Sequence, residues 1–158
     1  MNLEKYSQLA FFVGLQPKEI QLLAPYFAPQ TWVAGTVIFE QDDYAEYLYL
    51  VISGEVTIRF KPHDGPPMTV TRVQPGGIFG WSAAMNNPVY TSGGICSLDS
   101  EVLRIRGTDL RALCDKNPEV GRKILDRLAG VIAERQRSRQ GQVSSILASG
   151  MHQQQSRN

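Results

Sequence analysis

The fold follows from residues 77–84, which read Gly77-Ile78-Phe79-Gly80-Trp81-Ser82-Ala83-Ala84. The glycines make the first half a flexible loop, and the second half favours a short helical segment. Because a loop followed by a helix start presents backbone N–H groups, the stretch predicts a pocket for an anion. Short strands punctuated by glycine precede it, and a strand pair followed by a helix comes after it.

Composition predicts one compact domain with extensions. The chain has 158 residues, with 16 basic against 15 acidic side chains, so its net charge favours neither nucleic acid nor an acidic membrane as a partner. Cys96 and Cys114 lack the spacing of a disulfide framework or a metal site, which indicates a reducing compartment. The chain shows no charged-then-apolar leader and no apolar run near the roughly 20 residues that span a bilayer. We therefore expect a cytoplasmic protein that makes no membrane contact.

Residues 1–29 carry apolar side chains at helical spacing, and Gly14 and Pro17 divide them into two short helices. Residues 30–107 contain short runs of β-branched and aromatic residues with turn signals between them, and the expected strands cover residues 36–39, 47–52, 56–60, 68–73, 90–96 and 101–106. Ser53-Gly54 predicts a tight hairpin between two of them. Such a series without intervening helices predicts an antiparallel sandwich, barrel or jelly roll.

Residues 108–139 return to helical periodicity. Asn117 and Pro118 give the start signal of a long helix that we expect to end near Arg139. A second stripe, marked by Leu125 and Ile132, lies beside a heptad-like rhythm of apolar residues, so one stripe can dock on the β core and leave the other for a partner. We predict a homodimer and assign its interface to Val120, Ile124, Leu128 and Val131. The alternative is one wide core face. Residues 140–158, rich in Ser, Gln and Gly, predict a mobile tail.

The order of elements and several motifs together resemble the cyclic nucleotide-binding domain family, which includes bacterial catabolite activator proteins and kinase regulatory subunits. The resemblance covers about residues 9–137. The motifs that carry it are Phe12-Val13-Gly14-Leu15, Ile38-Phe39-Glu40-Gln41-Asp42-Asp43, Leu48-Tyr49-Leu50-Val51-Ile52-Ser53-Gly54-Glu55-Val56 and Pro75-Gly76-Gly77-Ile78-Phe79-Gly80. It implies a β-roll flanked by helices and a regulatory sensor that transmits ligand binding through its C-terminal helices.

Residues 76–92 resemble the phosphate-binding cassette of that family. The family cassette has a Phe-Gly pair followed by Glu, then Arg and a hydroxyl residue about ten positions later. There the arginine neutralises the cyclic phosphate and the carboxylate accepts from the ribose 2′-hydroxyl. This chain keeps Phe79-Gly80, but Trp81 stands at the Glu position and Val89-Tyr90 at the Arg position. Because no basic residue lies between Arg72 and Arg104, both charged contacts are missing.

Loss of two charged hydrogen bonds, at about 1.5–3 kcal/mol each, predicts weak or absent binding of cyclic AMP and cyclic GMP. Backbone N–H groups and aromatic surface leave room for another small anion, and the alternative is that Trp81 fills the pocket. No resident cofactor is expected. The candidate ligand-binding residues are Phe79, Gly80, Trp81, Ser82, Ala83, Tyr90, Thr91 and Ser92.

Three functions remain open at this point. The first is a sensor that signals to a protein partner without a DNA-binding domain of its own, because only 19 residues follow Arg139 and they show no helix-turn-helix pattern. The second is a ligand-free dimerisation or docking adaptor with a degenerate pocket. The third is a cupin-type metalloenzyme, which His63 and His152, the only histidines, argue against because one lies in a loop and the other in the tail. We therefore expect no catalytic residue, no metal site and no nucleic-acid partner.

Overall fold

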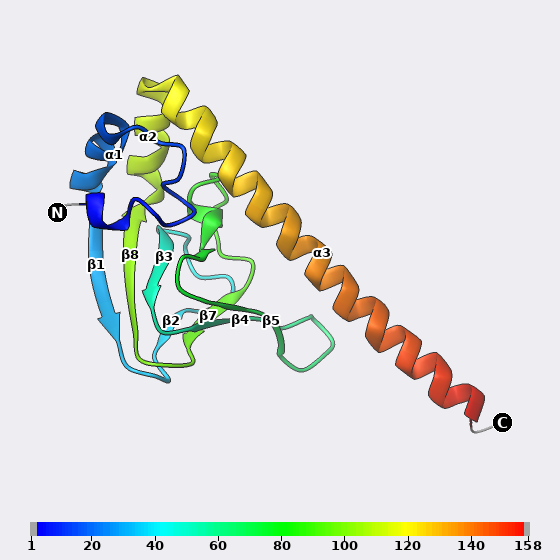
Figure 1. Cartoon of the computed structure of the whole chain (residues 1–158). Helices are drawn as coiled ribbons and strands as arrows, with labels where there is room; N and C mark the ends of the chain where they lie inside the picture. Colours follow the sequence, from blue (N-terminus) through cyan, green and yellow to red (C-terminus); the bar gives the residue numbers. More distant parts are fainter. Residues whose placement is uncertain (1–2, 157–158) are drawn as a thin grey trace.

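The computed structural model describes residues 3–156, with side chains described for residues 5–137. It contains two antiparallel sheets, and helices cover one end (Figure 1). The elements in chain order are η1 (Leu3–Tyr6), α1 (Pro17–Leu23), η2 (Ala24–Tyr26), β1 (Phe27–Trp32), β2 (Val37–Phe39), β3 (Tyr47–Ser53), β4 (Val56–Phe60), β5 (Met68–Val73), β6 (Ile78–Phe79), η3 (Trp81–Ala83), β7 (Gly93–Cys96), β8 (Ser100–Arg106), α2 (Gly107–Lys116) and α3 (Pro118–Ser156).

The two sheets confirm the predicted β-roll. One has the strand order β1-β8-β3-β6 and the other β2-β7-β4-β5. Strand β8 shows how the first sheet serves two cores, because successive side chains of a strand point to opposite faces. Val102 belongs to the cluster inside the roll, whereas Leu103 and Ile105 belong to the cluster that packs against the helices. The sheet thus ties the interior of the roll to the helical layer.

The hairpin predicted at Ser53-Gly54 was wrong. Strands β3 and β4 belong to different sheets, and the turn carries the chain from one sheet to the other. Strand β3 pairs with β8 on one edge and β6 on the other, so it has no edge free for β4. Gly54 has a φ of +87°, and a Cβ there would lie 2.3 Å from the carbonyl oxygen of Asp99, so the turn requires glycine.

The N-terminal prediction of helices over residues 1–29 was right only for α1. Its first part forms the 3₁₀ helix η1 and turns, and Phe27 already begins strand β1. Proline is tolerated in β1 because this strand lies at the edge of its sheet, where a missing N–H costs little. Pro29 and its polar neighbours therefore hid a strand that the pairing with β8 stabilises.

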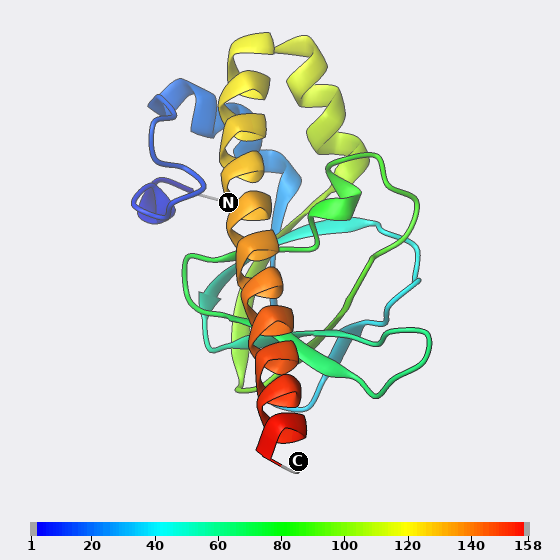
Figure 2. The same ribbon diagram turned by 90° about the vertical axis from the view of Figure 1, so that its right-hand side faces the viewer.

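Helix α3 continues to Ser156, so the predicted helix end near Arg139 was wrong. The prediction of a mobile tail was wrong for residues 140–156, which are helical. Residues 157–158 lie outside the described part. The segment contains no proline after Pro118, and an isolated glycine costs a helix only about 1 kcal/mol. In Figures 1 and 2 the helix starts above the roll, runs past it and extends beyond the strands. No described helix combines the length and hydropathy needed to cross a bilayer.

The proposed dimer interface was also wrong. Val120, Ile124 and Leu128 are nearly fully buried in the core of their own chain, and Val131 packs against the same cluster. The first stripe of the helix is therefore the one that docks on the roll. The second stripe begins at Leu125, whose side chain is 49% exposed. A single wide core face, the alternative, would have buried Leu125, whereas Ile132, the other predicted member of the second stripe, is half-buried.

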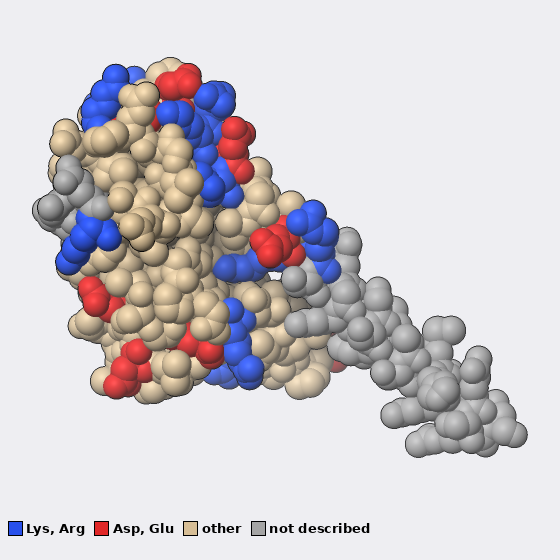
Figure 3. Space-filling view, in the orientation of Figure 1, with Lys and Arg blue, Asp and Glu red and all other residues tan. Residues whose placement is uncertain are grey.

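Charges of both signs are mixed over the helical end of the face shown in Figure 3, while uncharged surface covers much of the strands. On α3, Arg122 pairs with Glu119 and Asp126 at the surface. This face therefore shows no large single-sign patch of the kind that binds nucleic acid.

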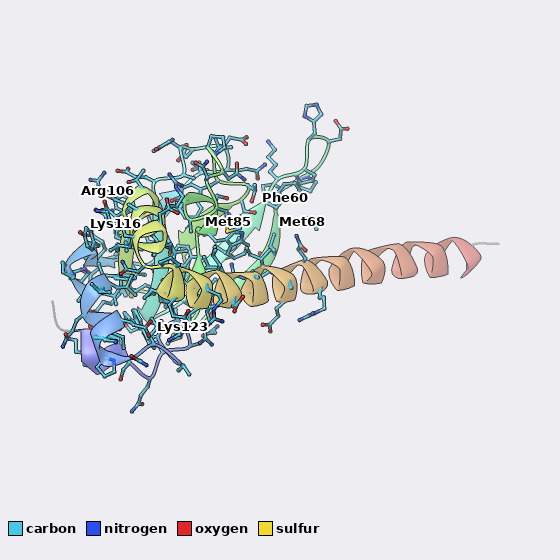
Figure 4. All side chains as sticks on the ribbon, turned by 90° about the horizontal axis from the view of Figure 1, so that it is seen from above. Phe60, Met68, Met85, Arg106, Lys116 and Lys123 are labelled. Atoms are coloured by element: carbon cyan, nitrogen blue, oxygen red, sulfur yellow. The ribbon has the colours of Figure 1, made fainter. Side chains whose placement is uncertain are left out.

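An ion pair joins the N-terminal helix to α3. Glu19 is buried, its Oε1 accepts from Lys123 Nζ at 2.8 Å, and the same oxygen accepts from the backbone N–H of Gln16 at 2.8 Å. Figure 4 shows Lys123 on the first turns of α3, toward the N-terminal segment. The hydrogen bonds from Gln16 and Lys123 lower the pKa of Glu19. The pair fixes one end of α3 on the domain.

We expect K123M to lower the free energy of unfolding by about 1–2 kcal/mol at pH 7, because it leaves a buried carboxylate without its cation. The pKa of Glu19 lies below its usual 4.5, so this contribution is present at neutral pH and is lost as the pH falls from 4.5 through the folded-state value. Urea denaturation at pH 7 and pH 3 measures both effects. The control is R122M, which breaks only exposed pairs and should cost less than about 0.5 kcal/mol. Equal losses in the two variants would contradict the prediction.

Candidate functional site

A cavity of about 380 Å³ lies between the roll and α3. Six of the eight predicted ligand-binding residues line it: Gly80, Trp81, Ser82, Tyr90, Thr91 and Ser92. Phe79 and Ala83 do not, because both side chains are buried in the inner cluster behind the cavity wall. The predicted cassette therefore does form one wall of a pocket, and its size falls in the range of small-molecule sites.

The loop enters the short helix through Gly80. This residue has a φ of +76°, and a Cβ there would lie 2.9 Å from the carbonyl oxygen of Tyr47. Glycine is thus required by conformation and by space. The helix that follows, η3, is a single 3₁₀ turn of three residues, so it offers an anion little of the dipole that a long helix would supply.

Stacked aromatic rings lie at and behind one wall of the cavity, and of these Phe39 and Tyr90 line the cavity directly. The rings of Phe39 and Tyr90 lie 3.8 Å apart, and those of Tyr49 and Phe79 lie 4.8 Å apart. The hydroxyl of Tyr90 donates to the carbonyl of Tyr47 at 2.6 Å and accepts from the N–H of the same residue at 2.9 Å. Burial raises the pKa of Tyr90, and it raises that of Tyr49 to about 12. Tyr90 lines the cavity, while its hydroxyl is occupied by the two hydrogen bonds to the backbone of Tyr47.

Trp81 lines the cavity without filling it. Its side chain is half-buried and packs against the helical cluster, so the alternative in which it closes the pocket was wrong. Met85, at the end of the same segment, also lines the cavity and lies beside α3 in Figure 4. The pocket is open and has substantial aromatic and apolar surface.

Helix α3 brings a cation into this pocket that the sequence analysis missed. Arg135 lines the cavity together with Ile132 and Gln136. Its Nη2 donates to the carbonyl of Ile78, and its guanidinium lies over the ring of Trp81 at 4.6 Å. Burial lowers the pKa of Arg135 to about 10. The two charged residues of the family cassette are missing as predicted, but the pocket still contains a cation, which comes from α3.

The spacing of the apolar residues along α3 places Arg135 on the core-facing side of the helix. The apolar positions Ile124, Leu128 and Val131 are separated by four and three residues, and the next step of four reaches Arg135. A cation at a core-facing position is costly unless it has a function there. Because Arg135 lies outside the cassette, the cassette motif alone does not predict it.

Arginines from both C-terminal helices hold the cassette. Arg111 of α2 donates to the carbonyl of Ala83 at 2.5 Å, and Arg135 of α3 donates to that of Ile78. Gly107 at the start of α2 lies so close that a Cβ would be 2.1 Å from the Ala83 carbonyl oxygen. The cassette is therefore in direct contact with both α2 and α3.

A second cavity, of about 660 Å³, lies against the β4–β5 loop and the outer end of β2. Its charged side chains are mixed in sign: Glu40, Asp42, Arg59 and Lys61. His63 also lines it. The described residues contain no cluster of three or more His, Cys, Asp or Glu side chains that could hold a metal ion.

Comparison with known proteins agrees with this geometry. A family model described as cyclic nucleotide-binding domain matches residues 29–117. The cyclic AMP receptor protein of Thermus thermophilus is 32% identical over 127 residues, which cover 80% of this chain and 56% of that protein. This chain thus spans little more than half the length of curated relatives that it matches.

Solved structures show the same fold. The Thermus thermophilus catabolite activator protein has 28% sequence identity and a TM-score of 0.70, and the match covers 89% of this chain and 63% of that one. A cyclic nucleotide-binding domain from Methylobacillus flagellatus has 20% identity and a TM-score of 0.80, with 90% and 85% covered.

We expect Tyr90→Phe to lower the free energy of unfolding by about 1–3 kcal/mol, because it leaves two backbone groups of Tyr47 without their partner. The matched control is Tyr44→Phe, which removes a hydroxyl from a side chain that is 68% exposed and should cost less than about 0.5 kcal/mol. Thermal and urea denaturation measure both. A Tyr90→Phe protein as stable as the wild type would show that the hydroxyl does not hold the start of β3.

Proposed function

This chain belongs to the cyclic nucleotide-binding domain family, and we propose that it is a non-enzymatic sensor in which helix α3 reports whether the pocket is occupied. The single observation that carries the proposal is that α3 forms part of the pocket wall. Ile132, Arg135 and Gln136 line the cavity, and Arg135 binds both the Ile78 carbonyl and the Trp81 ring. A molecule that enters must rearrange contacts that hold the helix.

The mechanism is a shift between two populations of α3. With the cavity empty, Arg135 ties the helix to the cassette. A ligand that competes for Arg135 or displaces Trp81 binds better to a state in which those contacts differ, and it shifts the equilibrium by that difference in affinity. Lys123 and the buried core residues hold the N-terminal end of α3 on the domain. The proposed change in helix position is therefore larger toward its C-terminal end.

The pocket favours an occupant other than a cyclic nucleotide. Its described lining contains no carboxylate to accept from a ribose hydroxyl, because Trp81 stands where the family has glutamate. The position of the cassette arginine falls on Val89-Tyr90. We therefore propose that cyclic AMP and cyclic GMP bind weakly, although relatives of this chain are named for cyclic AMP.

Binding rather than catalysis also fits the lining, whose described residues pair no nucleophile with a histidine or carboxylate base. Regulation of transcription, which the name of a longer relative states, is proposed for this chain through a protein partner. A cytoplasmic location is supported by two cysteines that are free, Cys96 and Cys114.

The second candidate is an adaptor that dimerises without a ligand. The exposed stripe of α3 favours dimerisation in either case, since Leu125 is followed by the small, exposed side chains of Ala129 and Ala133 on the same face. Close approach of two helices is easiest along such a face. The open cavity argues for the sensor over the adaptor.

Hydrogen exchange tests the coupling. We expect Trp81→Ala to raise amide exchange in α3 over residues 131–137 by about tenfold, and Arg135→Gln to raise it in residues 76–84, because coupling is reciprocal. Arg137→Gln is the matched control, since this arginine lies on the same helix but is exposed and outside the cavity. If α3 exchanges in Trp81→Ala as it does in the wild type, the helix does not report on the pocket.

Light scattering tests the dimer. We expect a homodimer at about 10 µM protein, and Leu125→Asp should convert it to a monomer because the charge would be buried in the interface. Leu98→Asp is the control, since Leu98 is similarly exposed but lies in the loop between β7 and β8. A monomeric wild type, or a Leu125→Asp protein that stays dimeric, would contradict this interface.

A further inference from the structure

Arg135 brings a positive charge into the cavity and forms no contact ion pair with a described carboxylate, although the charge of its neighbour Glu134 acts on it favourably. Of the cations that precede it on α3, Arg127 lies outside the cavity and donates to the Val13 carbonyl. Arg122 has carboxylate partners at the surface, and Lys123 pairs with buried Glu19. Arg135 instead donates to a carbonyl and lies over an aromatic ring, and it is the one charged residue in the described lining. Burial of an unpaired charge is unfavourable, so the site gains stability when an anion enters.

We propose that the cavity binds a small organic monoanion with an aromatic or apolar body, and that Arg135 of α3, not a cassette arginine, binds its oxyanion group. This inference deepens the proposed function, since it takes the cavity to be the ligand site of the sensor. It differs from the family pattern in where the positive charge comes from and in what kind of molecule that charge selects.

The guanidinium is placed to bind an oxyanion. It carries five N–H donors in a planar fork, one of its two terminal nitrogens binds the Ile78 carbonyl, and the stacking on Trp81 covers one face while the edge remains for a ligand. Hydroxyl groups of Ser82, Thr91 and Ser92 in the same lining can donate to the remaining oxygens. Because the described lining contains one cation, it can neutralise one negative charge of a ligand, and a second negative charge on that ligand would stay unpaired.

The rest of the lining selects the body of the ligand. Phe39, Ile58, Tyr90 and Ile132 present aromatic and aliphatic surface around the charged group. A planar ring can stack on this surface, whereas a ribose would face it without the carboxylate acceptor that the family uses. An aromatic monoanion therefore matches both the charge and the surface of this cavity.

Two fluorescent probes test the charge requirement. The first is 8-anilinonaphthalene-1-sulfonate, an aromatic monoanion, and the second is N-phenyl-1-naphthylamine, the same ring system without the sulfonate. We expect Arg135→Gln to weaken binding of the sulfonate by roughly 10- to 100-fold, as for loss of hydrogen bonds to a charged group, and to leave binding of the neutral probe unchanged. Arg137→Gln should change neither. Arg135→Lys should restore part of the affinity, because it keeps the charge but not the fork.

The proposal is overturned if the wild type binds the two probes equally well, or if Arg135→Gln weakens both or neither. Circular dichroism and melting of each variant verify the fold, and the comparison of the two probes on the wild type needs no variant at all. Cyclic AMP should displace the sulfonate only above about 0.1 mM. Displacement at micromolar cyclic AMP would show a nucleotide site and overturn the proposed ligand class.

The same probes separate this inference from the proposed function. Hydrogen exchange of α3 is measured with the sulfonate bound. If the sulfonate needs Arg135 but α3 exchanges as before, the anion site stands and the sensor mechanism fails. If the sulfonate does not need Arg135 while Trp81→Ala still alters α3, the sensor mechanism stands and the anion site fails.

Discussion

The structure depends on how the first half of α3 packs against the outer face of the roll. Ile124 and Leu128 are nearly fully buried against the sheet that contains β8, together with Leu110 of α2. Burial of each such side chain contributes about 1.5–3 kcal/mol, and this contact fixes both the position of the helix along the roll and its rotation. A helix set in that register must bring the residue seven positions after Leu128 to the same face, and that residue is Arg135.

Because a helix is stiff over a few turns, its anchor points constrain one another. Lys123 and Arg135 are separated by about 18 Å along the helix axis, at 1.5 Å per residue. The first is held by the Glu19 carboxylate and the second by the Ile78 carbonyl. Between them lie the core contacts of Ile124, Leu128 and Val131, so the helix is held at three places along this segment. Leu125 lies two residues from Lys123, so the exposed stripe begins at the anchored end of the helix.

Turn residues and strand periodicity are local signals, and they predicted an antiparallel sandwich, barrel or jelly roll, the cassette loop and the helix start at Pro118. The family resemblance narrowed the fold to a β-roll. It failed where tertiary pairing decided the outcome. Strand β1 contains Pro29 and is stabilised by β8, a partner about seventy residues away. The turn at Gly54 was interpreted as a hairpin because local sequence cannot show that both edges of β3 are already paired. Arg135 lies fifty-four residues from Trp81, so the two halves of the site share no local pattern.

The identity of residue 81 determines whether the charge of Arg135 is neutralised within the protein. If glutamate stood at position 81, as in the family cassette, its carboxylate would form an ion pair with Arg135 and neutralise the charge before any ligand entered. An indole ring holds the same guanidinium through its π face and leaves the charge intact, since the ring carries none. The replacement that removes the acceptor for a ribose hydroxyl is thus also the one that keeps Arg135 available to an anion. A pocket without the cassette arginine thus has a cation from α3, and the proposed sensor would place the electrostatic half of ligand recognition on that helix.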